Sequence, residues 1–305
     1  MQQTSAVDPK LCKKMSPIKR GIESILAITG IITIGITIAI VFILGEESIN
    51  FFKHVTVREF LTTFEWQPHI EKFGIWPLLN ATLMTSFFGM LVALPIGFFT
   101  AVFLAEYAES SLKRKIKPVL EILAGIPTVV FGYFALNFIT PLLQSLFGFN
   151  TVSVYNNASA GIAIGILLVP LVASLIEEAL SAVPRHLREA AYAVGATKLE
   201  VTLGIVVPSA LSGIVATVLL ALSRAFGETM IVAIAAGAGP AFTINPFKSA
   251  ETMTGHMARI AGGDLPYDSI DYQSLFAIAL FLFIITFLLN LIGRSISRRY
   301  MEHYE

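Results

Sequence analysis

The stretch SALSGIVATVLLALSRAFGE, residues 209–228, joins an apolar run to two ionisable side chains. A membrane-spanning helix needs about 20 residues, and between Glu200 and Lys248 only Arg224 and Glu228 are formally charged. The two residues are four apart, so we expect them to share one helix face and hydrogen bonds. Because a charged side chain is costly at membrane depth, the pair predicts either a functional site or a tight structural pair.

The composition predicts an all-α integral membrane protein. Of the 305 residues, 55% are hydrophobic and 14% are charged, and the mean hydropathy is +0.75. Continuous apolar runs disfavour a β-barrel, whose strands alternate in polarity. Span length and turn-forming residues predict six membrane-spanning helices. We expect them near residues 24–44, 76–104, 122–147, 160–177, 209–238 and 272–293.

The positive charges predict the orientation of these spans. Fifteen lysines and arginines fall in the N-terminal tail (1–23), the loops after the second and fourth spans, and the C-terminal tail (294–305), against five in the three opposite loops. By the positive-inside rule, both termini and the loop at 184–208, here named the connecting loop, are cytosolic. We therefore expect a multi-pass protein of the cytoplasmic membrane, whose first apolar run is a retained anchor.

Several function classes lack support in the sequence. The chain contains no G-x-x-x-x-G-K-[ST] phosphate-binding motif and no H-E-x-x-H motif. Its single cysteine, Cys12, excludes an internal disulfide, and the scattered basic residues do not suggest nucleic-acid binding. We expect no cofactor, no metal and no enzymatic activity. If the protein moves a solute uphill, the energy must come from a partner or an ion gradient.

The connecting loop predicts two short helices around a turn. Pro184 suits a first helical position, and Gly195 is placed to end the first helix in a left-handed conformation. Thr197 and Glu200 have the spacing of a capping box that starts the second helix, which we expect Pro208 to end as it opens the fifth span. Such a hairpin either lies on lipid headgroups or packs against a protein partner.

The connecting loop also resembles a known motif. Glu189-Ala190-Ala191, three residues, Gly195, nine residues, Ile205, one residue and Val207-Pro208 are similar to the EAA loop of ABC-importer permeases, with valine where leucine is usual. The resemblance implies that this loop docks into a cleft on an ATPase subunit and transmits its motion. The implied coupling residues are Glu189, Ala190, Ala191, Gly195, Ile205 and Pro208.

Other stretches narrow the resemblance to one branch. Ser223–Met230 (SRAFGETM) and Leu123–Gly132 (LAGIPTVVFG) resemble the signatures of phosphate-specific ABC permeases, and Phe64–Pro68 with Phe73–Pro77 is similar to their C-type subunit. The resemblance implies a type I, MetI-like core of five helices over 76–293, preceded by an extra helix and outer loop over 24–75. The implied partners are a second permease, two cytosolic ATPase subunits and an extracytoplasmic phosphate-binding protein.

The residues leave two interpretations of Arg224 and Glu228 open. The pair is either a structural ion pair or a substrate-pathway site, in which the arginine fork stabilises a passing phosphate and the glutamate tunes or gates it. The functional alternatives are a permease for another oxyanion or small solute, and an ion-coupled secondary transporter. The absence of paired inverted repeats with broken helices disfavours the secondary transporter.

Three weaker features complete the expectations. Glu106 and Glu121 flank the basic loop after the second span, and we expect both to be solvated. Gly161 and Gly165 form a small-xxx-small pattern that could allow close helix packing. Residues 249–261 can form an amphipathic helix that either folds back toward the pore mouth or contacts a binding protein.

Overall fold

A computed structural model describes residues 17–263, 265–267 and 269–301 of the chain. The chain divides into two compact units, residues 1–46 and 47–305, and each is described by itself. Cys12, most of the predicted N-terminal tail and residues 302–305 lie outside the described residues.

The described secondary structure is almost entirely helical. The helices are α1 (Pro17–His54), α2 (Val57–Thr62), α3 (Trp76–Val102), α4 (Ser110–Gly125), α5 (Thr128–Phe134), α6 (Thr140–Phe147), α7 (Asn157–Ser181), α8 (Arg185–Ala193), α9 (Lys198–Val201), α10 (Val207–Ser209), α11 (Leu211–Phe226), α12 (Met230–Ala235), α13 (Met253–Ala261) and α14 (Ile270–Met301). Three π-helical segments (Phe103–Tyr107, Ala135–Ile139 and Thr202–Val206), a 3-10 turn (Pro68–Ile70) and a small hairpin of β1 (Trp66–Gln67) and β2 (Lys72–Phe73) complete the elements.

The predicted all-α membrane fold is confirmed. Five helical segments are long and apolar enough to span a membrane, and a bent pair makes a sixth if it counts as one span. They are Gly21–His54, Trp76–Tyr107, Thr128–Phe147, Asn157–Ser181, Ile270–Ile296 and the pair Lys198–Ser209 with Leu211–Phe226. Within the first unit, α1 is exposed from Gly21 to Ile40, as expected of an apolar helix surrounded by lipid.

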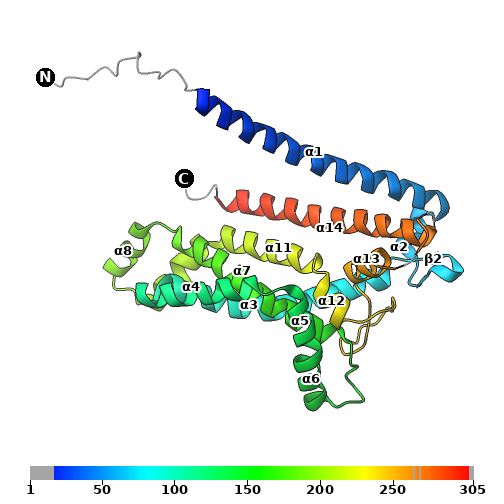
Figure 1. Cartoon of the computed structure of the whole chain (residues 1–305). Helices are drawn as coiled ribbons and strands as arrows, with labels where there is room; N and C mark the ends of the chain where they lie inside the picture. The colour runs from blue at the N-terminus through cyan, green and yellow to red at the C-terminus, as the bar shows by residue number, and fades with distance from the viewer. Residues whose placement is uncertain (1–16, 264, 268, 302–305) are drawn as a thin grey trace. The chain divides into compact units, whose positions relative to one another are not determined.

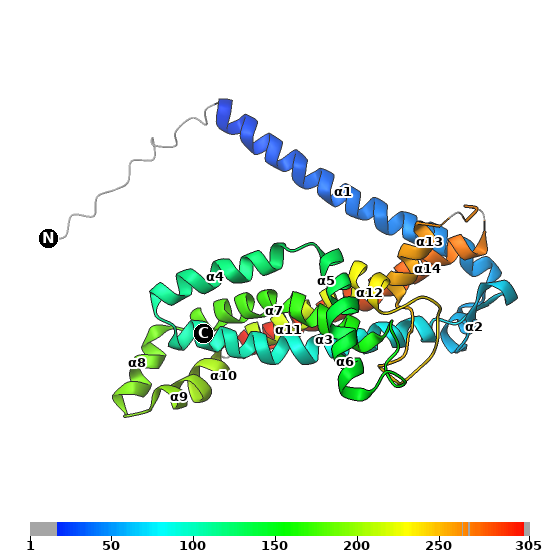
Figure 2. The same ribbon diagram turned by 60° about the horizontal axis from the view of Figure 1, so that its bottom comes forward.

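The third span begins later than predicted, at Thr128 rather than residue 122. Residues 122–125 belong instead to α4, which has no buried residue in the described chain and is separated from α3 in Figure 2. The helix stops because Pro127 disfavours helical geometry at the preceding residue, and Ile126 accordingly adopts ψ 129°. The basic loop is thus an amphipathic helix followed by a sharp break.

The predicted continuous fifth span over 209–238 is wrong, because the chain breaks twice. At Ala210 (φ −88°, ψ 3°) the axis bends by 67°, and Pro208 does not end the preceding helix as expected. It lies in the first turn of α10, where its missing N–H costs nothing. Farther along, α11 ends at Phe226 and α12 begins only at Met230.

The second unit is built on a close pairing of α3 with α7, beside which α11 and α14 run (Figure 1). A Cβ on Gly161 would lie 2.6 Å from the Cβ of Phe88, and one on Gly165 would lie 2.6 Å from the Cβ of Val92. Only glycine allows the two backbones to approach this closely. The small-xxx-small expectation is therefore confirmed.

The end of this unit that carries α2 and β2 lies opposite α8 (Figure 1), and aromatic side chains cluster there. Phe51 lies edge-on to Phe60 and Phe73, with ring centroids 6.1 and 5.4 Å away. Met253 of α13 is fully buried in the same cluster, whereas Met257 is half-buried. The predicted helix is therefore present as α13, and it packs against α3 and α14.

Candidate functional site

The connecting loop folds as the predicted helix–turn–helix. Gly195 has φ +89°, and its N–H donates to the Tyr192 carbonyl at 3.0 Å. The capping box is present: the Thr197 N–H donates to Glu200 Oε2 at 2.7 Å, and the Glu200 N–H reaches Thr197 Oγ1 at 3.4 Å. Pro184 stands one position earlier than predicted, as the extended residue before α8.

The predicted coupling residues divide into exposed and packed positions. Glu189, Ala190, Gly195 and Pro208 are exposed, Ala191 is buried and Ile205 is half-buried. Four large side chains on the same hairpin are exposed, namely Tyr192, Val194, Leu199 and Leu203. We name them the loop patch. An apolar patch of this kind on a mostly polar hairpin is typical of an interaction surface.

A largely buried ion pair that was not predicted from the sequence fastens the hairpin to the bundle. Arg188 Nη2 lies 3.0 Å from Glu106 Oε1, and the two side chains are 17% and 6% exposed. The expectation that Glu106 is solvated is therefore wrong. The same guanidinium donates to the carbonyls of Leu180 and Val183 at 2.8 and 2.5 Å. The partners are 82 residues apart, so no local pattern reveals the pair.

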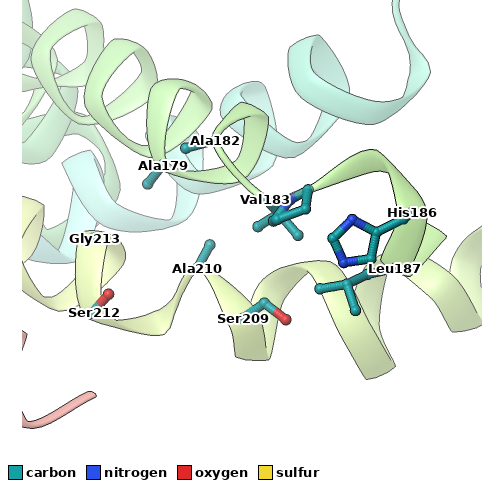
Figure 3. A pocket seen from close by; sticks show the side chains of 10 residues that line it. Ala179, Ala182, Val183, His186, Leu187, Ser209, Ala210, Ser212 and Gly213 are labelled. Atoms are coloured by element: carbon teal, nitrogen blue, oxygen red, sulfur yellow. The ribbon is translucent and has the colours of Figure 1, made fainter. Parts of the chain in front are cut away.

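A hollow of about 380 Å³ lies at the foot of the hairpin and is shown in Figure 3. The end of α7, the start of α8 and both sides of the bend at Ala210 form its walls. It is lined by Ala179, Ala182, Val183, Pro184, His186, Leu187, Ser209, Ala210, Ser212 and Gly213. Interiors are normally filled by side chains, whereas the junction of α7, α8 and α11 is left open here.

The second candidate site is the break after α11, where the structure separates Arg224 from Glu228. In the part of the chain that the structure describes, no hydrogen bond or ion pair joins them, so the predicted shared bonds are wrong. Glu228 Oε1 instead accepts from the Ile231 N–H at 3.3 Å, and the Glu228 carbonyl accepts from Thr254 Oγ1 at 2.6 Å. Glu228 thus caps α12 and ties it to α13.

Arg224 points into a groove of about 610 Å³ between α11 and α14. It is exposed, and among the described residues no partner for its guanidinium is found. The groove is mainly apolar, but Ser223, Thr286 and Asn290 also line it. These three residues were not predicted from the sequence, although Asn290 stands out as an amide inside the last apolar run.

A third polar cluster braces the segment between α12 and α13. The buried Glu251 carboxylate accepts from Arg259 Nε at 2.7 Å and the Gly239 N–H at 3.1 Å, and lies 3.1 Å from His256 Nδ1. Burial by itself raises the pKa of Glu251, but hydrogen bonding to His256 and Arg259 outweighs burial and lowers it. The bond to Glu251 raises the pKa of Arg259, so both charges persist at neutral pH.

Comparisons with known proteins place this geometry in a family. A family model described as "Binding-protein-dependent transport system inner membrane component" matches residues 93–302. A probable ABC transporter permease of Bacillus subtilis, YqgH, is 30% identical, and the match covers 90% of this chain and 89% of YqgH. The phosphate transport permease PstC of Mesorhizobium japonicum is 35% identical, covering 79% of this chain and 78% of its own.

Solved structures share the fold. A chain of a bacterial alginate ABC transporter matches with a TM-score of 0.62 and 14% identity, covering 92% of this chain and 96% of that one. A chain of the MetNI methionine ABC transporter matches with a TM-score of 0.54 and 22% identity, covering 74% and 94%. The protein belongs to the family of binding-protein-dependent transport system inner membrane components, the permeases of ABC transporters.

Proposed function

We propose that this chain is the C-type permease subunit of an ATP-driven importer of inorganic phosphate. The observation that carries the proposal is the exposed Arg224 guanidinium in an otherwise largely apolar groove, in a chain 35% identical to a phosphate transport permease. An arginine at membrane depth is costly unless something pairs with it. A phosphate oxyanion matches the arginine fork better than it matches a lysine point charge.

The break after α11 supports a role for the site in passage rather than in assembly. The Glu228 carboxylate accepts from the Ile231 N–H, and the Glu228 carbonyl accepts from Thr254. Because no ion pair joins Glu228 to Arg224 among the described residues, the guanidinium is available to an anion. In this proposal Glu228 shapes the interruption of the helix, and Ser223 and Asn290 supply further polar contacts along the groove.

The connecting loop supports the proposed assembly. Glu189 and the loop patch present a charge and apolar side chains together on one exposed hairpin, a surface suited to an ATPase subunit in the cytosol. Both termini then lie in the cytosol, in keeping with the charge distribution. The complete importer contains a second permease, two ATPase subunits and an extracytoplasmic phosphate-binding protein, which places this chain in the cytoplasmic membrane.

The test is phosphate uptake by reconstituted vesicles carrying the full set of subunits. We expect Arg224→Gln to assemble, to keep the ATPase response to loaded binding protein, and to lower uptake at least tenfold. Arg114→Gln, on exposed α4, is the matched control. Because Arg224 and Glu228 do not touch, Glu228→Gln should not restore uptake in the double variant.

Three outcomes would contradict the proposal. Recovery of uptake in the double variant would mean that the two charges act as a structural pair. Uptake of a different oxyanion with phosphate at background would assign the same class of permease to another substrate. Uptake by this chain alone, abolished by uncouplers and indifferent to ATP, would instead indicate a secondary transporter.

A further inference from the structure

We propose that Glu106 is the positioning residue of the connecting loop, and that its pair with Arg188 transmits movement of that loop to the α3–α7 pair. The inference rests on the proposed function, because it assumes that an ATPase moves the loop. Glu106 lies outside the connecting loop, and in this proposal the direction in which the loop moves depends on it.

The contact has the geometry of a joint between three elements. Arg188 lies in α8, Glu106 lies in the π-helical segment that prolongs α3, and the carbonyls of Leu180 and Val183 lie at the end of α7 and just beyond it. Both Nε and Nη2 of Arg188 lie within reach of Glu106 Oε1, at 3.3 and 3.0 Å. One guanidinium therefore holds α8 against the ends of two long helices at once.

The chemistry makes this joint stiff. Charge-assisted hydrogen bonds are shorter and roughly twice as strong as neutral ones, and opening a buried pair leaves a charge without a partner. Arg188 also places a positive charge beside the carbonyls at the end of α7, where the helix dipole favours it. A second contact supports the first, because Lys198 Nζ of α9 lies 4.8 Å from the ring centroid of Tyr107, next to Glu106.

The two helices beyond the joint are themselves locked together. Besides the glycine contacts described above, a Cβ on Gly97 would lie 2.6 Å from Val172 Cγ1, so α3 and α7 approach closely near the joint as well. A movement of α8 is therefore delivered to both helices as one body. The other end of the hairpin continues through α10 into α11, which carries Arg224. The loop is therefore connected to the membrane helices at two places, to the α3–α7 pair through Glu106 and to α11 through α10.

Glu106 itself lies in a π-helical segment, Phe103–Tyr107. Segments of this kind are rare and frequently occur at functional sites. The connecting loop carries another, at Thr202–Val206, directly before α10. The hollow of Figure 3 lies between α8 and α11, and in this proposal it provides the space for their angle to change.

The experiment compares Glu106→Gln and Arg188→Lys with Glu109→Gln, a change at an exposed residue three positions from Glu106. All are made in the complete reconstituted importer. Complex yield, ATPase rate with loaded binding protein, and phosphate transported per ATP hydrolysed are measured together. We expect both joint variants to assemble and hydrolyse ATP, while phosphate transported per ATP falls about tenfold. Glu109→Gln should match the unaltered protein in all three.

A distance measurement separates this inference from the question of substrate. Spin labels at Phe99 and Ala193, both exposed and outside the loop patch, are introduced after Cys12 is replaced. The interlabel distance should be narrowly distributed in the unaltered complex and at least twice as broad in Glu106→Gln. This readout does not require phosphate, so it holds even if the transported solute is another one.

Several results would overturn the inference. They are an unchanged ratio of transport to ATP hydrolysis in both variants, an unchanged distance distribution, or a fall in uptake that only matches loss of assembled complex. If both variants fail to assemble, the pair is structural and the positioning role is excluded.

Discussion

Replacing Gly195 with valine isolates the contribution of one backbone conformation to the connecting loop. Gly195 has φ +89°, and among the described residues no atom lies within 4 Å of the position that a Cβ would occupy. Valine therefore introduces no clash, and its effect comes from the backbone alone. A left-handed conformation costs a residue with a Cβ about 1–2 kcal/mol, and more for a β-branched one.

This strain sets the expected loss of affinity. If the hairpin relieves it by changing the turn, the docking conformation is depopulated by about 5- to 30-fold, because about 1.4 kcal/mol corresponds to a factor of ten. We expect the Kd between the purified permease pair and the ATPase subunit to rise by that factor. The Kd of Gly195→Asn should fall between the values for glycine and valine at this position, since asparagine tolerates the left-handed region.

The matched control is Gly204→Val on the same hairpin. Gly204 also has open space around its Cβ position, but its φ is not positive, so valine there adds bulk without this strain. Titration of labelled ATPase subunit onto both variants measures the difference. Equal Kd values for Gly195→Val and Gly204→Val would refute the argument that a left-handed turn holds the loop in its docking shape.

Three further outcomes are expected. Gly165→Val should lower the thermal unfolding midpoint and the yield of folded protein, because overpacking costs about 1–3 kcal/mol, whereas Gly30→Val, with open space around it, should not. Glu251→Gln should destabilise the protein by about 1–3 kcal/mol at pH 7. Because the folded pKa of Glu251 lies below its ordinary 4.5, the carboxylate stabilises the fold above pH 4.5, and this stabilisation is lost as pH falls through the lowered value. The thermal unfolding midpoints of the unaltered protein and the Glu251→Gln variant should therefore converge in acid. In a cysteine-free background, an impermeant reagent added outside should label Phe149→Cys and not Val194→Cys, and the opposite labelling would reverse the proposed orientation.

The sequence by itself determined the class of fold and the local structure of the connecting loop. Long charge-free runs are enough to predict spanning helices, because lipid requires every backbone polar group to be paired within the segment. The turn at Gly195 and the capping box of Thr197 and Glu200 were predicted correctly for a related reason. Their hydrogen bonds join residues three or four positions apart, so the spacing of residues along the chain is enough to predict which of them are in contact.

Only the tertiary structure decided how the charged residues pair. Arg224 and Glu228 looked like neighbours on one helix, but the contacts of Glu228 with Ile231 and Thr254 end α11 between them. Glu106 looked solvated until α8 brought Arg188 to it from 82 residues away. The cost of burying a charge depends on what surrounds it in space, and for these residues the surroundings come from distant parts of the chain.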